Sequence, residues 1–259
     1  MNNAQILVAA ANALFVIACG IVSVRLLILS RRTQQLPEFY LGAGFSAMVV
    51  AIPLMGVSGL GRLTAGEIDF LTLSLGLLLL WLSISTQAAF TWTAFRPRSA
   101  WAEYLVMSIA ASEAVIVGGA MHSLGAAPLT TPSFVAVYDW MFWLRVPLGI
   151  VYVWTALESA QQYRMARRRN RIGLGDPVTT NRLLLWTANS LVGVFTVSLS
   201  ALLHMQKKGP FADPHAAAAM GLSGLAGAVL LYLAFMPPAR YLRMLRASAP
   251  ADDAATAEA

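Results

Sequence analysis

Long apolar stretches alternate with short polar connections along almost the whole chain. A membrane helix needs roughly 20 mainly apolar residues, and seven stretches reach that length. They cover residues 4–29, 39–60, 71–95, 104–121, 134–157, 183–205 and 216–236. The pattern predicts an all-α membrane protein, in which residues 1–236 form a bundle of seven transmembrane helices.

The segment after the seventh stretch has a different pattern. Pro237 and Pro238 stop the seventh helix, because proline lacks the backbone N–H that continues a helix. Residues 237–247 then put arginines on one helical face and apolar side chains on another, which predicts a short amphipathic helix on the inner leaflet. Residues 248–259 are small and acidic, and we expect them to be disordered.

Cations are distributed unevenly among the connections. Thirteen lie in segments 30–38, 96–103 and 161–182 and in the tail after residue 236, against three in the other connections. Cytoplasmic loops of membrane proteins carry the excess of Lys and Arg. We therefore expect the N-terminus outside and the C-terminus in the cytoplasm, with the protein in the plasma membrane, the inner membrane of a bacterium.

The most basic connection, residues 161–182, holds six arginines against one acid, Asp176. Arginines at helical spacing predict that the fifth helix continues beyond the bilayer until Gly173 and Gly175 end it. We expect the extension to contact anionic headgroups, with a cytoplasmic protein partner as the alternative. The arginines concerned are Arg164, Arg167, Arg168, Arg169 and Arg171. The residues expected to cap the sixth helix are Thr179, Thr180 or Asn181.

A weak internal similarity relates the two halves of the chain. At an offset of 140 positions, Arg31 aligns with Arg171 and Pro37 with Pro177. This register aligns helices one to three with helices five to seven and leaves the fourth as a linker. It indicates a parallel three-plus-one-plus-three repeat, of a kind found in some transporters, although chance similarity between apolar helices is the alternative.

Composition supports a lipid environment. The chain is 58% hydrophobic and only 12% charged, whereas soluble domains have about 25% charged residues. The net charge of +6 follows from the loop arginines, so we expect no nucleic-acid partner. Cys19 is the only cysteine and lies in an apolar stretch, which excludes an intramolecular disulfide.

Charged residues inside the apolar stretches are the first candidates for a site, because they are costly in lipid unless paired. Glu113 and Arg145 lie about half-way along the fourth and fifth stretches, which run in opposite directions. Asp139 is about one and a half turns from Arg145. Together they predict a polar ligand site or a proton path. A structural ion pair between the two helices is the alternative.

Other polar residues complete the candidate ligand site. His122 and His204 lie near the outer ends of their stretches, while Gln87 and Asn189 lie closer to the cytoplasm. Two histidines that converged could hold a metal or a haem, but no spacing in the chain matches a metal motif, and we assign no metal ligand. Interfacial histidines and helix-to-helix hydrogen bonds are the alternative interpretations.

The positions of the lysines exclude a conventional retinal protein. A retinal Schiff base needs a lysine within the membrane, and the only lysines, Lys207 and Lys208, lie in an outer loop. No nucleophile–base pair or nucleotide-binding loop can be identified, so we expect the protein not to be an enzyme and assign it no cofactor.

The segment GLGDPVTTNR, residues 173–182, together with the closing Pro-Pro-Ala and its amphipathic tail, resembles bacterial multi-pass membrane proteins of uncharacterised activity. The resemblance implies a topology and no activity. Similarity to opsins and receptors is one of topology alone.

These features predict a heptahelical sensor, receptor-like and non-enzymatic, with an outward-facing polar pocket for an unknown small ligand. Binding would bias the fifth helix, kinked at Pro147, and move its basic extension. A small-solute or proton-coupled transporter is the first alternative, favoured by the repeat and the buried acids. A haem- or metal-binding membrane protein is the second.

Overall fold

The structure is a computed structural model, which describes residues 3–65, 70–125, 131–206 and 213–247. This part of the chain is helical throughout and contains no strand. Its helices are α1 (Asn3–Thr33), α2 (Leu36–Ala65), α3 (Phe70–Phe95), α4 (Ala100–Gly125), α5 (Thr131–Arg171), α6 (Pro177–Met205), α7 (Pro214–Phe235) and α8 (Ala239–Ala247).

Helices α1 to α7 are each long and apolar enough to cross a membrane. The apolar stretches expected from the sequence fall within them, except that Met236 follows the last residue of α7 as its C-terminal cap. Pro53 lies inside α2 and Pro147 inside α5 without ending either helix. The seven spans make this a membrane protein, whose polar residues must find partners within the bundle. The expected disordered tail, residues 248–259, lies outside the described residues.

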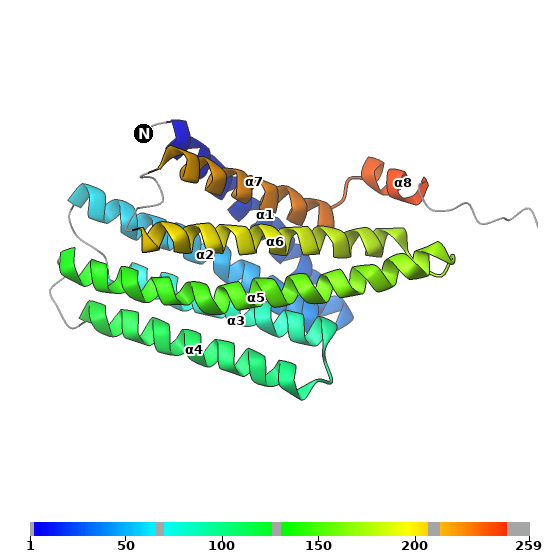
Figure 1. The fold of residues 1–259 in the computed structure, drawn as a ribbon, viewed down its shortest axis with the longest axis horizontal. Helices are drawn as coiled ribbons and strands as arrows, with labels where there is room; N and C mark the ends of the chain where they lie inside the picture. The colour runs from blue at the N-terminus through cyan, green and yellow to red at the C-terminus, as the bar shows by residue number, and fades with distance from the viewer. Residues whose placement is uncertain (1–2, 66–69, 126–130, 207–212, 248–259) are drawn as a thin grey trace, which may run out of the picture.

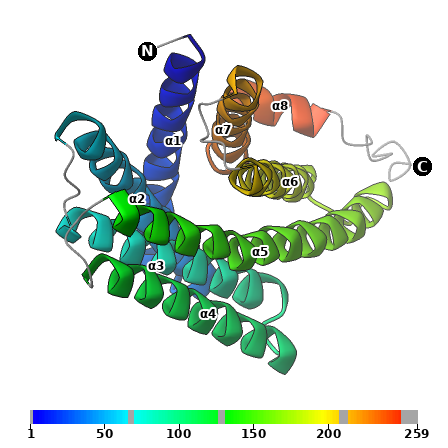
Figure 2. The same cartoon turned by 60° about the vertical axis from the view of Figure 1, so that its left-hand side comes forward.

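Six of the helices form a ring, and α4 lies outside it (Figures 1 and 2). Around the ring, neighbouring helices pack in the order α1, α2, α3, α5, α6 and α7, and α7 packs back against α1. Within the described residues, α4 contacts only α3 and α5. The short α8 turns away after α7 and contacts α6, where the Tyr241 hydroxyl donates to Asn181 Oδ1 at 3.1 Å.

The turn between α5 and α6 is built from local hydrogen bonds. Gly173 has a φ of 70°, the left-handed conformation that ends many helices. Asp176, in an extended conformation, then caps α6 by accepting from the backbone N–H groups of Val178 and Thr179 at 3.0 Å. The expectation that Thr179, Thr180 or Asn181 caps α6 is therefore wrong. Proline is favoured as the first residue of a helix, so Pro177 moves the cap to the residue before it.

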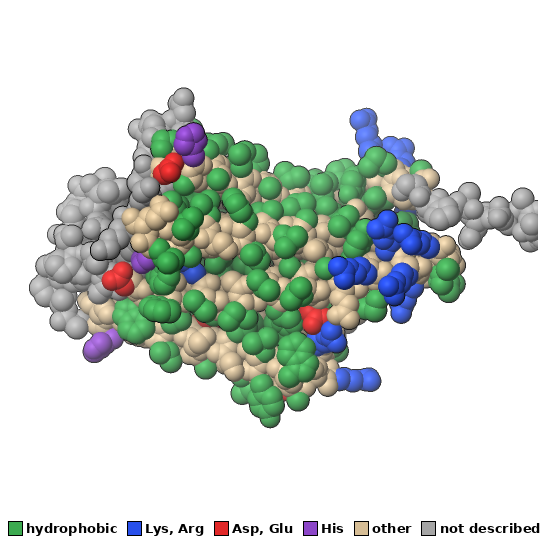
Figure 3. Space-filling model, viewed as in Figure 1, with side chains coloured by type: hydrophobic (Ala, Val, Ile, Leu, Met, Phe, Trp, Pro, Cys, Tyr) green, Lys and Arg blue, Asp and Glu red, His purple; other side chains and the backbone are tan. Residues whose placement is uncertain are grey.

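Arginine side chains gather at one end of the bundle, where α5 ends and α8 lies (Figure 3). We call this the basic end. The arginines of the α5 extension are all exposed: Arg164, Arg167, Arg168, Arg169 and Arg171. The three arginines of α8 are exposed as well: Arg240, Arg243 and Arg246. The other end of the bundle, where α6 ends and α7 begins, is called the opposite end below.

Candidate functional site

Arg145 of α5 is held in the interface with α6. Its Nε donates to the hydroxyl of Ser200 at 2.9 Å, and its Nη1 donates to the backbone oxygen of Met141 at 3.0 Å. Its guanidinium carbon lies 5.9 Å from the centre of the Phe142 ring, within the range of a cation–π interaction. The half-buried guanidinium thus contacts a hydroxyl, a backbone oxygen and an aromatic ring.

His204 and Asp139 lie beside Arg145 toward the opposite end. The His204 ring stacks on Phe142 with centroids 4.6 Å apart. Its Nε2 is 3.6 Å from Asp139 Oδ1, too far for a hydrogen bond but close enough for an ion pair when the imidazole is protonated. The structure therefore brings together three predicted residues, Asp139, Arg145 and His204, along one α5–α6 interface.

Glu113 belongs to a different interface. The side chain is completely buried on α4, and its Oε2 accepts from the Ser85 hydroxyl of α3 at 2.8 Å. Its other oxygen, Oε1, has no hydrogen-bond partner among the described residues. Glu113 therefore contacts α3 while Arg145 contacts α6, so the structural ion pair, the alternative interpretation of these two residues, is not formed. The shared ligand site stays a prediction. The sequence indicated similar depth in the membrane, but it could not show that the two side chains face different helices.

The predicted histidines lie apart. His122 is exposed near the end of α4, a helix that makes no described contact with α6, which carries His204. His215 is exposed in the first turn of α7. Among the described residues, no group of three or more His, Cys, Asp or Glu side chains could hold a metal ion.

Gln87 and Asn189 lie on different helices, α3 and α6. Gln87 is buried on α3, where its backbone oxygen accepts from the Thr91 hydroxyl at 3.1 Å. Asn189 is half-buried on α6 and lines a cavity inside the helix ring.

The cavity has a volume of about 230 Å³, is lined by residues of five helices and is partly open, with Asn12 exposed. We call it the central cavity. No charged residue is among those that line it. Its polar lining residues are Asn12, Tyr152, Asn189, Thr196 and Ser223. Its other lining residues are Val8, Phe15, Ile52, Leu148, Val192, Gly193, Val197, Met220, Gly224 and Gly227. Several hydrogen-bonding groups around a small apolar space are typical of a site for a small molecule.

Small residues keep the central cavity open. A Cβ added to Gly193 would lie 2.6 Å from the Tyr152 ring, so the ring packs flat against α6. A Cβ added to Gly227 would lie 3.3 Å from Phe15 and 3.6 Å from the side-chain oxygen of Asn189. Larger residues at these glycines would displace Tyr152 or fill the space beside Asn189.

Trp186 lies one helical turn from Asn189 on α6, toward the basic end, and is buried in an aromatic cluster. Its ring meets Phe90 at 5.5 Å, Phe235 at 5.6 Å and Phe45 at 6.5 Å between centroids, each in an edge-to-face arrangement. Its indole Nε1 is buried and has no hydrogen-bond partner among the described residues. A buried, unpaired N–H is unusual in a protein interior.

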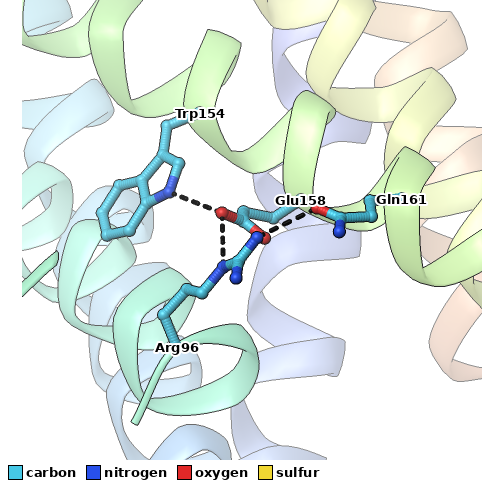
Figure 4. A network of polar contacts seen from close by, with 4 residues as sticks. All are labelled: Arg96, Trp154, Glu158 and Gln161. Atoms are coloured by element: carbon cyan, nitrogen blue, oxygen red, sulfur yellow. Dashed lines mark hydrogen bonds and ion pairs between the residues drawn. The ribbon is translucent and has the colours of Figure 1, made fainter. Parts of the chain in front are cut away.

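At the basic end, a polar network joins α3 to α5 (Figure 4). Arg96 Nε lies 2.9 Å and 3.0 Å from the two carboxylate oxygens of Glu158, and Arg96 Nη2 donates to Gln161 at 3.0 Å. Trp154 Nε1 donates to the same carboxylate at 3.4 Å. Glu158 is buried, so its charge depends on these donors.

Sequence reasoning named Asn189 but missed Asn12 in the central cavity, and it missed Glu158 in the polar network at the basic end. Asn12 is a polar group inside the first apolar stretch, and such residues commonly face the interior of a bundle. Glu158 directly follows the expected fifth stretch, at the same end as Arg96. Opposite charges at the same end of two spans are compatible with an ion pair. The sequence alone, however, does not show which helices are neighbours.

No protein-family model, curated protein or solved structure matches this chain. The seven spans agree with a multi-pass membrane protein, the coarse part of the resemblance found in the sequence.

Proposed function

We propose that this protein is a membrane permease for a small, uncharged, polar solute. It is the transporter function that the sequence offered as an alternative to a sensor. The observation that carries the proposal is the central cavity, a partly open space with a polar lining to which five helices of the ring contribute. A solute there would contact residues of five helices.

The chemistry of the cavity suggests the class of solute. Amide groups of Asn12 and Asn189 and hydroxyls of Tyr152, Thr196 and Ser223 can donate and accept hydrogen bonds. None of them carries a charge, and a charged solute in this setting would lack a counter-ion. A polyol, an amide or a small sugar would meet both requirements.

The cavity lining also supports the proposed internal repeat. Three pairs of its residues are 140 positions apart, the offset found in the sequence. The pairs are Val8 and Leu148, Asn12 and Tyr152, and Ile52 and Val192. Helix packing has the same relationship, since α1 packs on α2 and α7 just as α5 packs on α6 and α3. Two such units around a shared cavity are the plan on which many transporters alternate access.

The orientation of the protein in the membrane is proposed from its cations. We place the basic end in the cytoplasm, because Lys and Arg are enriched in cytoplasmic loops, and the protein in the plasma membrane. The exposed arginines of the α5 extension would then face anionic headgroups, where each contributes about 1 kcal/mol.

A sensor is the second candidate, and one observation favours it. Helix α5 is continuous over 41 residues, from the region of Asp139 and Arg145 to the exposed arginines at the basic end. A ligand held at the α5–α6 interface could shift this helix and its extension together. Such a protein would bind its ligand without moving it across the membrane.

Flux through proteoliposomes separates these functions. The purified protein would be reconstituted and loaded with radiolabelled glycerol, urea, glucose and, as charged comparisons, glutamate and lysine. The permease predicts faster equilibration of at least one neutral solute than in protein-free vesicles, with no effect on the charged ones. Equal rates for every solute would reject it. A visible spectrum of the same preparation tests the haem alternative, which requires a Soret band.

A further inference from the structure

A second pocket lies between the central cavity and the basic end. It has a volume of about 170 Å³ and is formed by α1, α2, α3, α6 and α7. Two cations and an acid lie at this pocket: Arg25, Arg182 and Glu38. We call it the basic-end pocket. It differs from the uncharged central cavity, and it contains Phe90 and Phe235, two members of the aromatic cluster around Trp186.

The two pockets follow one another along a single axis. On α6, Arg182 lines the basic-end pocket and Asn189 lines the central cavity, with Trp186 between them. Seven residues of helix correspond to about 10 Å. The order is repeated on α2, where Phe45 lies between Leu41 of one pocket and Ile52 of the other.

Helices α1 and α7 have the same order. On α1, the fully buried Cys19 lies between Phe15 of the central cavity and Arg25 of the basic-end pocket. On α7, the buried Leu231 lies between Gly227 and Phe235. Four helices thus place one apolar layer at the same depth, and the Trp186 ring contacts aromatic rings on α2, α3 and α7.

The layer has features of a barrier that can open. Edge-to-face ring contacts are short-range and non-covalent, and each is weak on its own. The unpaired Trp186 N–H would gain a partner if its ring moved into either polar pocket, since both contain acceptors. In the closed arrangement the Trp186 N–H makes no hydrogen bond to a described residue. A hydrogen bond formed on opening would therefore offset part of the lost ring contacts.

We propose that Trp186, with Phe45, Phe90 and Phe235, is the gate between the central cavity and the basic-end pocket, and that solute leaves through it. This inference rests on the proposed permease function and assigns its exit path. In the structure described here the gate is closed. Movement of the indole ring joins the two pockets into one passage to the basic end.

Cys19 supplies a native reporter for the gate. It is the only cysteine of the chain and its side chain is fully buried within the gate layer. A charged, membrane-impermeant methanethiosulfonate reagent reacts with a thiol only where water reaches it. Labelling of everted and right-side-out vesicles, read by intact mass, therefore reports whether the passage is open and toward which side.

Trp186→Ala is expected to raise the labelling rate of Cys19 at least tenfold over wild type when reagent is applied at the basic end. The matched control is Trp143→Ala, since Trp143 is an exposed tryptophan on the lipid-facing side of α5. It should label as slowly as wild type. Phe235→Ala removes a second member of the gate and provides the test if Trp186→Ala does not yield a monodisperse protein.

Labelling of Cys19 in both gate variants at the wild-type rate would overturn the gate. Equal acceleration in Trp143→Ala would also overturn it, because the effect would then be general loosening. Solute flux by the wild-type protein is measured separately. Flux without gate-dependent labelling rejects the gate alone, whereas gate-dependent labelling without flux of any neutral solute rejects the permease and with it this exit path.

Discussion

The Nε of Arg96 lies 2.9 Å and 3.0 Å from the two carboxylate oxygens of Glu158, linking the end of α3 to the buried face of α5. The Arg96 side chain is 38% exposed and that of Glu158 only 7%. The charge of Glu158 therefore depends on Arg96 more than the charge of Arg96 depends on Glu158. Water can solvate the guanidinium if Glu158 is lost, but it cannot easily reach the buried carboxylate if Arg96 is lost.

Replacing Arg96 by Met should destabilise the bundle by roughly 2–3 kcal/mol, below the usual range for a broken buried pair because the site is partly hydrated. Unfolding in mixed detergent micelles measures this loss. Combining Arg96→Met with Glu158→Gln should recover much of the stability, since no charge is then left buried. The control is Arg98→Met, an exposed arginine two residues away. Equal losses of stability in Arg96→Met and Arg98→Met would show that the Arg96–Glu158 pair does not stabilise the bundle.

Glu113→Gln should leave both the fold and solute flux nearly intact. The amide keeps the size of the side chain and an oxygen that can accept from Ser85, so the loss should stay within about 1 kcal/mol, the contribution of one hydrogen bond. Glu113 lies between α3 and α4, outside the central cavity. Flux that disappears in Glu113→Gln while the protein stays folded would instead favour a proton-coupled transporter.

Asp176 gives the start of α6 a defined pH dependence. The Thr179 hydroxyl, the backbone N–H groups of Val178 and Thr179 and the charge of Arg182 hold the pKa of Asp176 below its ordinary value of 3.8. A lowered folded-state pKa means that the carboxylate's stabilisation is complete above about pH 4 and is lost as the pH falls through the folded-state value.

Asp176→Ala should therefore cost about 1 kcal/mol at neutral pH, as for other lost N-caps. The gap from wild type should narrow when thermal unfolding is repeated at progressively lower pH. Asp176→Asn keeps an acceptor for the cap and serves as the control: its loss at neutral pH should be smaller than that of Asp176→Ala, and its gap from wild type should narrow in acid in the same way. A gap between wild type and Asp176→Ala that widens in acid would contradict this role.

The proposed orientation can be tested with reporters at the C-terminus. A green fluorescent protein fused after residue 259 should fluoresce, because that protein folds in the cytoplasm, and an alkaline phosphatase fused at the same place should be inactive. Neutralising the α5 extension should weaken this preference, because it removes five of the cations on that side. Active phosphatase on the unmodified chain would reverse the assignment.

The sequence was informative about single helices and much less so about their neighbours. Hydropathy located all seven spans, and arginine spacing predicted the extension of α5, which ends at Arg171 as the following glycines indicated. Of the seven residues proposed for a ligand site, Asp139, Arg145 and His204 lie along one interface, because two of them are close in sequence and the third is at the facing end of the next helix. Their role in binding stays a prediction.

The rest depended on the order of helices around the ring. Glu113 was expected beside Arg145, but α4 lies outside the ring and turns this residue toward Ser85. Asn12 and Asn189 reach the same cavity from opposite halves of the chain. A hydropathy pattern indicates how deep a residue lies in the membrane, but it does not indicate which neighbouring helix its side chain faces. It therefore could not show which polar groups converge.

In the proposed permease, solute passes through the cavity lined by Asn189, and a comparison of flux in two leucine variants tests this passage. Asn189→Leu keeps the branched skeleton of the side chain and removes its hydrogen-bonding groups. Ser198→Leu makes a polar-to-leucine change at an exposed position on the same helix. In proteoliposomes, the account predicts that neutral-solute flux falls at least tenfold in Asn189→Leu and stays at the wild-type rate in Ser198→Leu. Undiminished flux through folded Asn189→Leu would contradict it.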